Sequence, residues 1–249
     1  MFGPSSMMWR VNRELVVLLA GPAAAVLQVA HPQVARGVAA HSRFREDGMG
    51  RLRRTLDAVY RVAFGGPGEA EAVRTSVGRA HRAVRGEGYS AFDPGAQRWV
   101  LATLVMGSAT AYRRFVGPLE VSELDTLVAD YARFGTVFGT ESAPVNWDEF
   151  SAYWDAMLGG EELGSDPLCG EVARVIIKPC APCAMRLASP LVGALVAELV
   201  PETLQRKLQL AGSFWRRPVW KTLDVALPVL LPLAPSAWRF APHYRRACA

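Results

Sequence analysis

Apolar residues recur at helical spacing along most of the chain. Within residues 51–64 they recur at intervals of three and four positions, at Leu52, Leu56, Val59, Tyr60 and Ala63. This spacing is typical of an amphipathic helix with one buried face. The segment Gly-Gly-Pro-Gly at 65–68 ends that helix. The alternation of apolar and polar residues that is typical of β-strands is nearly absent. The pattern therefore predicts an all-α fold, which we expect to be a single multi-helix domain over residues 1–249.

The same spacing predicts further helices along the chain. We expect them at residues 9–20, 23–30, 34–42, 69–84, 98–115, 123–138, 147–158, 171–177, 187–199 and 202–214. Pro22 is expected to stop or kink the first of these, and Ser122 and Asn146 are expected N-caps. Residues 43–50, 86–95 and 159–167 are predicted loops. The tail beyond residue 214 is rich in Pro, Trp and Arg, and no helix is predicted there.

Two apolar runs, at 15–30 and 226–234, are candidates for a membrane-spanning helix. The first is short, is interrupted by Gly21-Pro22 and contains Gln28; the second is shorter and contains two prolines. Both are therefore predicted to be buried core and not integral spans. The N-terminal sequence lacks the pattern of a signal peptide, so we expect a cytoplasmic protein.

The chain has a formal net charge of +5 and a pI near 9.3. The basic residues are mostly arginines spread over helices that also carry acids, without interleaved aromatic residues, so we expect no nucleic-acid partner. The densest basic run extends from Arg43 to Arg61 and includes Arg45. A few of these arginines could pair with the carboxylates of a bound ligand.

The cysteines indicate no metal site. Cys180 and Cys183 form a C-x-x-C without a second pair or nearby histidines, so a zinc site is not predicted. We expect a loop with two incidental cysteines, and a redox role is the alternative. Since no C-x-x-C-H occurs, covalently attached c-type heme is excluded.

Three of the four histidines, His31, His41 and His81, lie in the first third of the chain. His81 lies between Val77 and Val84 on an apolar helical face, where an imidazole needs a partner, and an axial iron is one such partner. A di-iron carboxylate site is excluded because no Glu-x-x-His pair is present. The motifs of α/β-hydrolases and of dinucleotide-binding folds are also absent.

Three ordered segments carry a resemblance to a known family. They are GPAAAVLQVAHP at 21–32, HSRFRED at 41–47 and GRLRRTLD at 50–57. In order and spacing they resemble the catalytic domain shared by the bacterial rubber oxygenases (latex clearing proteins) and the endoplasmic-reticulum-bound oxygenase of mycophenolic acid biosynthesis. Weaker similarity continues through Tyr89, Asp93, Trp99, Tyr112 and the segments 115–119 and 153–158. The resemblance therefore covers most of the chain and is strongest before residue 118.

The resemblance implies a globin-like helical core that holds noncovalent heme b and uses dioxygen. It implies Arg51 and Thr55 as distal residues, with Arg54 at the position of a family lysine, and we take these three as candidate catalytic residues. It implies His81 as the proximal ligand of the iron. We also expect His31, His41 and Arg45 to bind the cofactor, although the two histidines could instead only support helices. Leu101 stands where the family commonly has a histidine.

The resemblance therefore implies a heme-dependent oxygenase that acts on a hydrophobic small molecule, such as a lipid, a terpenoid or a natural-product intermediate. Oxidative cleavage of a carbon–carbon double bond is the chemistry known for the family. One alternative is a noncatalytic heme or hydrophobic-ligand binding protein, a carrier or a sensor. Another is a membrane-associated helical protein, suggested by the apolar run at 15–30, the proline-rich tail and the basic pair Arg245-Arg246.

Overall fold

The computed structural model describes residues 1–42, 47–178, 183–210 and 216–249. The α-helices in chain order are α1 (Met7–Asn12), α2 (Gly21–Val29), α3 (Pro32–His41), α4 (Gly48–Phe64), α5 (Pro67–Ala83), α6 (Pro94–Phe115), α7 (Val121–Val137), α8 (Trp147–Gly159), α9 (Pro167–Ile177), α10 (Cys183–Leu199), α11 (Glu202–Lys207), α12 (Arg216–Leu230), α13 (Ser236–Arg239) and α14 (Pro242–Ala247). The 3-10 helices are η1 (Leu15–Ala20) and η2 (Leu231–Leu233), and the strands are β1 (Arg85–Gly86) and β2 (Tyr89–Ser90). The predicted all-α class is confirmed, since the only sheet among these residues is this two-stranded hairpin.

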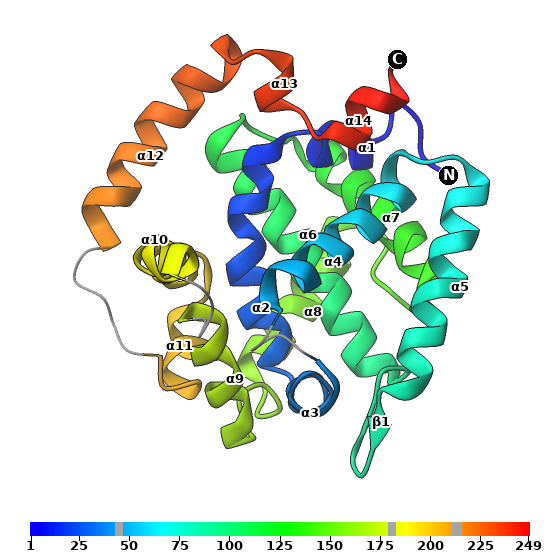
Figure 1. The fold of residues 1–249 in the computed structure, drawn as a ribbon, viewed down its shortest axis with the longest axis vertical. Helices are drawn as coiled ribbons and strands as arrows, with labels where there is room; N and C mark the ends of the chain where they lie inside the picture. The colour runs from blue at the N-terminus through cyan, green and yellow to red at the C-terminus, as the bar shows by residue number, and fades with distance from the viewer. Residues whose placement is uncertain (43–46, 179–182, 211–215) are drawn as a thin grey trace.

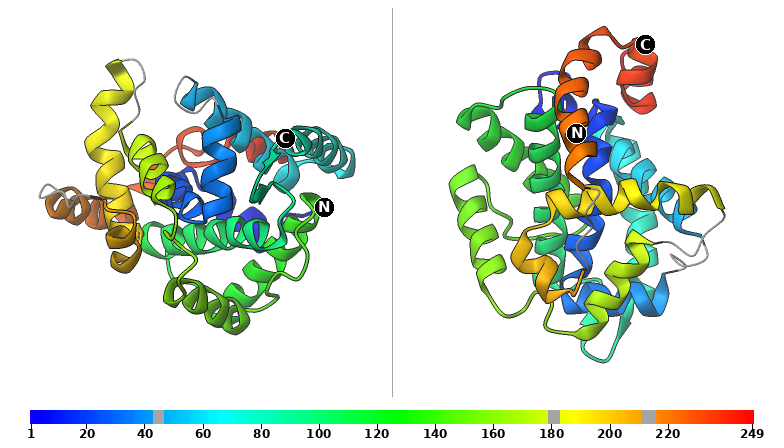
Figure 2. Two further views of the ribbon diagram at one scale, coloured as in Figure 1. Left: turned by 90° about the horizontal axis from the view of Figure 1, so that it is seen from below. Right: turned by 90° about the vertical axis from the view of Figure 1, so that its left-hand side faces the viewer.

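The long helix α6 runs through the middle of the molecule and organises the core (Figures 1 and 2). It contacts η1, α2, α7 and α12. Trp99 of α6 is completely buried, and its indole Nε1 donates a hydrogen bond to the carbonyl oxygen of Leu27 at 2.7 Å. Trp99 also stacks on Trp154 of α8, with 5.1 Å between ring centroids. These contacts join α2, α6 and α8 in one hydrophobic core.

The C-terminal segment returns to the beginning of the chain. Phe240 forms an isolated antiparallel bridge with Glu14. The buried carboxylate of Glu14 accepts two hydrogen bonds from Arg239, at 2.8 and 3.0 Å. Since a buried carboxylate needs such a partner, the bidentate pair explains how α13 and α14 are held beside α1.

Helix boundaries near the N-terminus differ from the prediction. The predicted helix at 9–20 is divided into α1 and the 3-10 helix η1. The 3-10 helix η1 ends at Ala20, directly before Gly21-Pro22 as predicted. Pro22 itself lies in the first turn of α2, where a missing N–H costs nothing. Pro32 likewise occupies the first turn of α3.

The N-cap predictions had mixed outcomes. Asn146 caps α8 as predicted, and its side chain accepts a hydrogen bond from the backbone N–H of Glu149. Ser122 was the wrong choice for α7, because Glu120 occupies the N-cap and forms a capping box with Glu123. A reciprocal pair of hydrogen bonds satisfies two free N–H groups of the first turn, which lets a glutamate serve as the cap.

The structure also contains elements where loops or an irregular tail were predicted. The predicted loop at 86–95 contains the end of the β1–β2 hairpin. The predicted helix at 202–214 ends at Lys207. The tail, for which no element was predicted, contains α12, α13 and α14. Pro218 is near the start of α12, and Pro228 lies inside the helix near its end.

No single helix within the described ranges is long and apolar enough to cross a membrane. Residues 15–29 and α3 together have the length and apolar composition of a membrane-spanning helix, but the two segments are bent by 103° relative to each other. Most of the first segment is buried against α6, as predicted. The prediction of buried core is wrong for the run at 226–234, where Val229, Leu230 and Leu233 are exposed.

Candidate functional site

The helices α4 and α5 form an antiparallel pair that carries the main candidate residues. The two helices contact each other and are joined by the short turn at Gly65-Gly66. Arg51 precedes Gly65 by 14 residues and His81 follows Gly66 by 15 residues. At a rise of about 1.5 Å per residue, both residues lie about 21 to 23 Å along their helices from the turn. Arg51 and His81 therefore both lie toward the ends of their helices that are remote from the turn, which we call the open end of the pair.

The pair is buried near its turn and accessible at its open end. Tyr60 and Phe64 of α4 and Val73 of α5 are buried. The helices diverge toward the other end (Figure 1), where Leu52 is 45% exposed and Leu56 is half-buried. An apolar helical stripe normally faces a core. Its exposure at the open end indicates a place where an apolar group can bind.

His81 is half-buried on α5 and faces the ring of Phe92 edge-on, with 6.1 Å between centroids. Neither of its ring nitrogens has a hydrogen-bond partner among the residues that the structure describes. Burial lowers the pKa of His81 below its ordinary value, so the imidazole is neutral near pH 7. A neutral imidazole with a free nitrogen is the form that coordinates iron.

Arg51, Arg54 and Thr55 lie within about one turn of α4, but they differ in environment. Arg51 is half-buried, and burial, followed by the charge of Arg54, lowers its pKa. Arg54 and Thr55 are exposed, and Arg54 forms an ion pair with Asp47 at 3.1 Å. Arg51 thus provides a cation in a partly desolvated position, whereas the charge of Arg54 is already engaged.

His41 ends α3 and is exposed. Its Nε2 lies 3.0 Å from the hydroxyl oxygen of Tyr89. Tyr89 belongs to β2, which packs against α3, and the hairpin follows α5 directly. His41 is therefore held beside the segment that succeeds His81. Arg45, the remaining candidate for cofactor binding, lies outside the described residues.

His31 has a different environment from His81. Its side chain is 1% exposed, and its Nε2 lies 3.1 Å from Oε1 of Glu162. Burial lowers its pKa, although Glu162 and Asp93 act in the opposite direction. The backbone N–H of Gly164 donates to the carbonyl oxygen of Ala30, which holds the same loop against α2. These contacts are those of a residue that joins α2 and α3 to the loop at 160–166.

The fourth histidine, His243, belongs to a separate pocket. Its Nε2 lies 3.1 Å from Oδ1 of Asp57. The pocket has a volume of about 410 Å³ and lies between the turn end of α4 and α14, with Tyr60 and Phe64 in its wall. Asp57 holds His243 in this pocket, and the other ring nitrogen of His243, Nδ1, is buried without a hydrogen-bond partner among the described residues.

The residues at the open end of α4–α5 fit noncovalent heme. A porphyrin supplies four donors, and the protein has to supply only an axial ligand; His81 has the right chemistry. Among the described residues, no group of three or more His, Cys, Asp or Glu side chains is arranged to hold a metal ion. Arg51 offers a half-buried cation to an anionic group, and Phe92, which is exposed, offers an apolar ring beside His81.

Sequence reasoning assigned no role to Phe92 and Tyr89, the aromatic neighbours of His81 and His41. The signal available in the sequence was the short segment 85–90 around Gly86 and Gly88. Gly88 has φ +73°, and Gly86 lies so close to the ring of Tyr89 that a Cβ atom would overlap it. A tight hairpin of this kind turns both aromatic residues back toward α3 and α5.

Comparison with known proteins agrees with the resemblance seen in the three N-terminal segments. An uncharacterized protein of Mycobacterium bovis, Mb2261, and one of Mycobacterium tuberculosis, Rv2237, are each 30% identical over 120 residues, 45% of this chain. The match spans about half the length, 47%, of each of these curated relatives. No solved structure matches. Residues 9–230 match the family described as ER-bound oxygenase mpaB/B'/rubber oxygenase, catalytic domain, and the chain belongs to this oxygenase family.

Proposed function

We propose that this protein is a heme b-dependent oxygenase that acts on a hydrophobic small molecule, with His81 as the axial ligand of the iron. The observation that carries the proposal is the half-buried, neutral imidazole of His81, which has no hydrogen-bond partner among the described residues. It lies at the same end of the α4–α5 pair as Arg51. Membership of an oxygenase catalytic-domain family supports the reaction class.

When bound, heme supplies the binding and activation of dioxygen. The residues of α4 supply the electrostatic environment. Arg51 is half-buried and positively charged, so it stabilises negative charge that develops near it, and it does so more strongly than a solvated cation would. The hydroxyl of Thr55, one helical turn from Arg51, can donate a hydrogen bond on the same side. Arg54 cannot act as a base, because a guanidinium does not lose its proton in proteins.

The substrate class follows from the apolar side chains at the open end of the pair. Leu52 and Phe92 are 45% and 48% exposed, and Leu56 is half-buried on the same face of α4 as Leu52. Exposed apolar side chains next to Arg51 on α4 and beside His81 favour an apolar ligand. A lipid, a terpenoid or another apolar intermediate fits this surface, and oxidative cleavage of a carbon–carbon double bond is the reaction to test first.

Absorption spectroscopy of the purified protein, with and without added hemin, tests the cofactor. We expect a Soret band in the natural protein that His81→Ala abolishes or shifts, and that added imidazole restores. His41→Ala and His243→Ala are the matched controls, because both remove a histidine whose Nε2 already has a partner; both should keep the band. A natural protein that stays colourless with hemin would overturn the proposal.

Cyanide binding to the hemin-loaded protein tests the role of Arg51. Arg51→Gln should weaken the affinity for this anion by about tenfold, since one lost charge interaction is commonly worth about 1 to 2 kcal/mol in a partly desolvated site. Arg53→Gln is the control, because Arg53 is exposed on the same helix. Equal affinities in both variants would contradict the assignment. Oxygen consumption with apolar alkenes then separates an oxygenase from a carrier, which would bind heme without consuming oxygen.

A further inference from the structure

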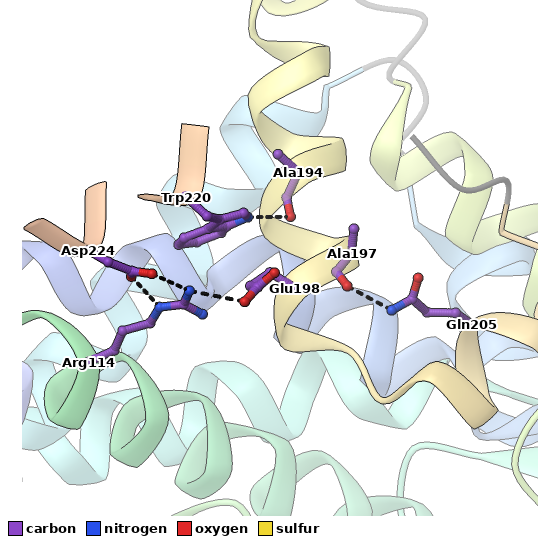
Figure 3. Close-up of polar contacts among 7 residues, drawn as sticks. All are labelled: Arg114, Ala194, Ala197, Glu198, Gln205, Trp220 and Asp224. Carbon is purple, nitrogen blue, oxygen red and sulfur yellow. Dashed lines mark hydrogen bonds and ion pairs between the residues drawn. The ribbon is translucent and has the colours of Figure 1, made fainter. Parts of the chain in front are cut away.

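The helix α12 lies at the edge of the molecule and presents two different faces (Figures 1 and 2). Its inner face is anchored by Trp220 and Asp224 (Figure 3). The indole Nε1 of Trp220 donates to the carbonyl oxygen of Ala194 on α10 at 2.9 Å. Asp224 accepts two hydrogen bonds from Arg114 on α6. With Trp220 and Asp224 directed inward, the rotation of α12 about its axis is determined.

The opposite face of α12 is apolar and unusually exposed. Val225 and Val229 are one helical turn apart, and the row continues into η2 and α13. We call the following residues the apolar stripe, with their exposed fractions: Val225 71%, Val229 63%, Leu230 57%, Leu233 78% and Trp238 80%. The outward face of a helix in a soluble protein is normally polar, so a succession of exposed apolar side chains of this kind marks an interaction surface.

The charge excess of the protein lies in the same segment. Residues 216–249 contain six of the 28 lysines and arginines and one of the 23 acidic residues. The remaining residues, 1–215, contain 22 of each sign, so the formal net charge of +5 belongs entirely to the C-terminal segment. Its single acid, Asp224, is neutralised by Arg114. Arg245 and Arg246 are exposed and have no ion pair with another described residue.

We propose that the apolar stripe docks this protein on the surface of a membrane that contains anionic lipids. An exposed valine and leucine row that ends in an exposed tryptophan, within a cationic segment, matches the chemistry of helices that lie in the lipid interface. The apolar helix over residues 222–233 is about 18 Å long at about 1.5 Å per residue, whereas a bilayer core is about 30 Å thick. It is therefore suited to lie in the interface and not to cross.

The charge distribution favours a lipid surface over a second copy of the chain. In a symmetric dimer the stripe would face itself, and two segments that each carry the whole excess of positive charge would meet. Like charges across an interface oppose association. An anionic lipid surface instead attracts each exposed cation, by about 1 kcal/mol for each lysine or arginine near it. This inference does not depend on heme binding.

Co-sedimentation with lipid vesicles tests the proposal. We expect the full chain to bind vesicles of phosphatidylcholine mixed with phosphatidylglycerol, and to bind pure phosphatidylcholine far more weakly. The variant Val229→Glu/Leu233→Glu should bind at least about tenfold more weakly, since the burial of one such side chain is commonly worth a factor of about ten. Val121→Glu/Val145→Glu is the matched control, because both valines are also exposed, at 64% and 56%, and it should bind like the natural chain.

Two double variants test how much the positive charge of the C-terminal segment contributes to vesicle binding. Arg245→Gln/Arg246→Gln should weaken binding to the anionic vesicles, and added salt should weaken the binding of the natural chain. Arg74→Gln/Arg133→Gln removes two exposed arginines outside the segment and should have a smaller effect. Circular dichroism confirms that each variant is folded.

Three results would overturn the proposal. One is a natural chain that stays in the supernatant with anionic vesicles. Another is equal vesicle binding by Val229→Glu/Leu233→Glu and Val121→Glu/Val145→Glu, which would show that the apolar stripe does not contribute to binding. The third is a dimer in solution that Val229→Glu/Leu233→Glu converts to a monomer, because the stripe would then be covered by a second copy.

Discussion

The guanidinium of Arg114 donates two hydrogen bonds to the carboxylate of Asp224, at 2.5 and 2.7 Å (Figure 3). A third hydrogen bond, at 3.0 Å, reaches Glu198 on α10. The guanidinium also lies over the ring of Trp220, 4.4 Å from its centroid. One side chain of α6 thus joins α10 and α12, and the hydrogen bonds raise its pKa, with that to Asp224 the largest contribution.

Loss of this connection should destabilise the fold. Arg114→Leu is expected to lower the free energy of unfolding by about 1 to 3 kcal/mol, because a bidentate, partly buried pair and a cation–π contact are lost together. Arg113→Leu, at an exposed neighbouring position, should change it by less than about 0.5 kcal/mol. Denaturant unfolding of both variants, and a double-mutant cycle with Asp224→Asn, measures the coupling. A coupling near zero would contradict this interpretation.

The stability of the protein should decrease as the pH falls below neutrality. Burial lowers the pKa of His31, so the unfolded state binds a proton before the folded state does. The contribution of His31 to the free energy of unfolding is therefore fully present above the pKa of the unfolded state, about 6.5, and is lost as the pH falls below it. His31→Gln should therefore flatten the pH dependence between about pH 7 and pH 5, measured by urea unfolding. An unchanged slope would show that His31 does not contribute.

Trp99 and Trp238 offer a matched comparison within one residue type. Trp99 is fully buried, stacks on Trp154 and donates a hydrogen bond to Leu27. Trp99→Phe should cost about 2 to 4 kcal/mol, because a cavity forms and a buried carbonyl loses its donor. Trp238→Phe, at an 80% exposed position, should cost less than about 0.5 kcal/mol. Similar thermal midpoints for the two variants would contradict the described core.

Cysteine reactivity should separate Cys169 from Cys248. Cys169 is completely buried, and burial raises the pKa of its thiol to about 11, whereas Cys248 is exposed. In a Cys180→Ser/Cys183→Ser background, a thiol reagent near about pH 8 should label Cys248 quickly and Cys169 only after unfolding, because the thiolate is the reactive form. Rapid labelling of Cys169 in the folded protein would show that the α9 region opens.

Local sequence patterns were sufficient for the helices of the central part of the chain. The spacing of Leu52, Leu56 and Tyr60 predicted α4, and the glycines at 65–66 predicted its end. Asn146 predicted the start of α8. These signals are local, because the helical period and the caps depend on residues within one or two turns. The composition of the tail did not predict α12, because the cost of a proline depends on where in the helix it lies, and Pro218 is in the first turn.

The candidate site depends both on the local sequence and on the tertiary structure. The sequence alone determined the all-α class, the α4–α5 hairpin and, through resemblance, the family and the candidate residues Arg51 and His81. Only the tertiary structure decided that His31 is engaged by Glu162, whereas His81 keeps its ring nitrogens free of described partners. It also decided which face of α12 is exposed. The reason is physical: a helix follows from neighbours in the chain, but the partner of a side chain follows from how distant segments pack.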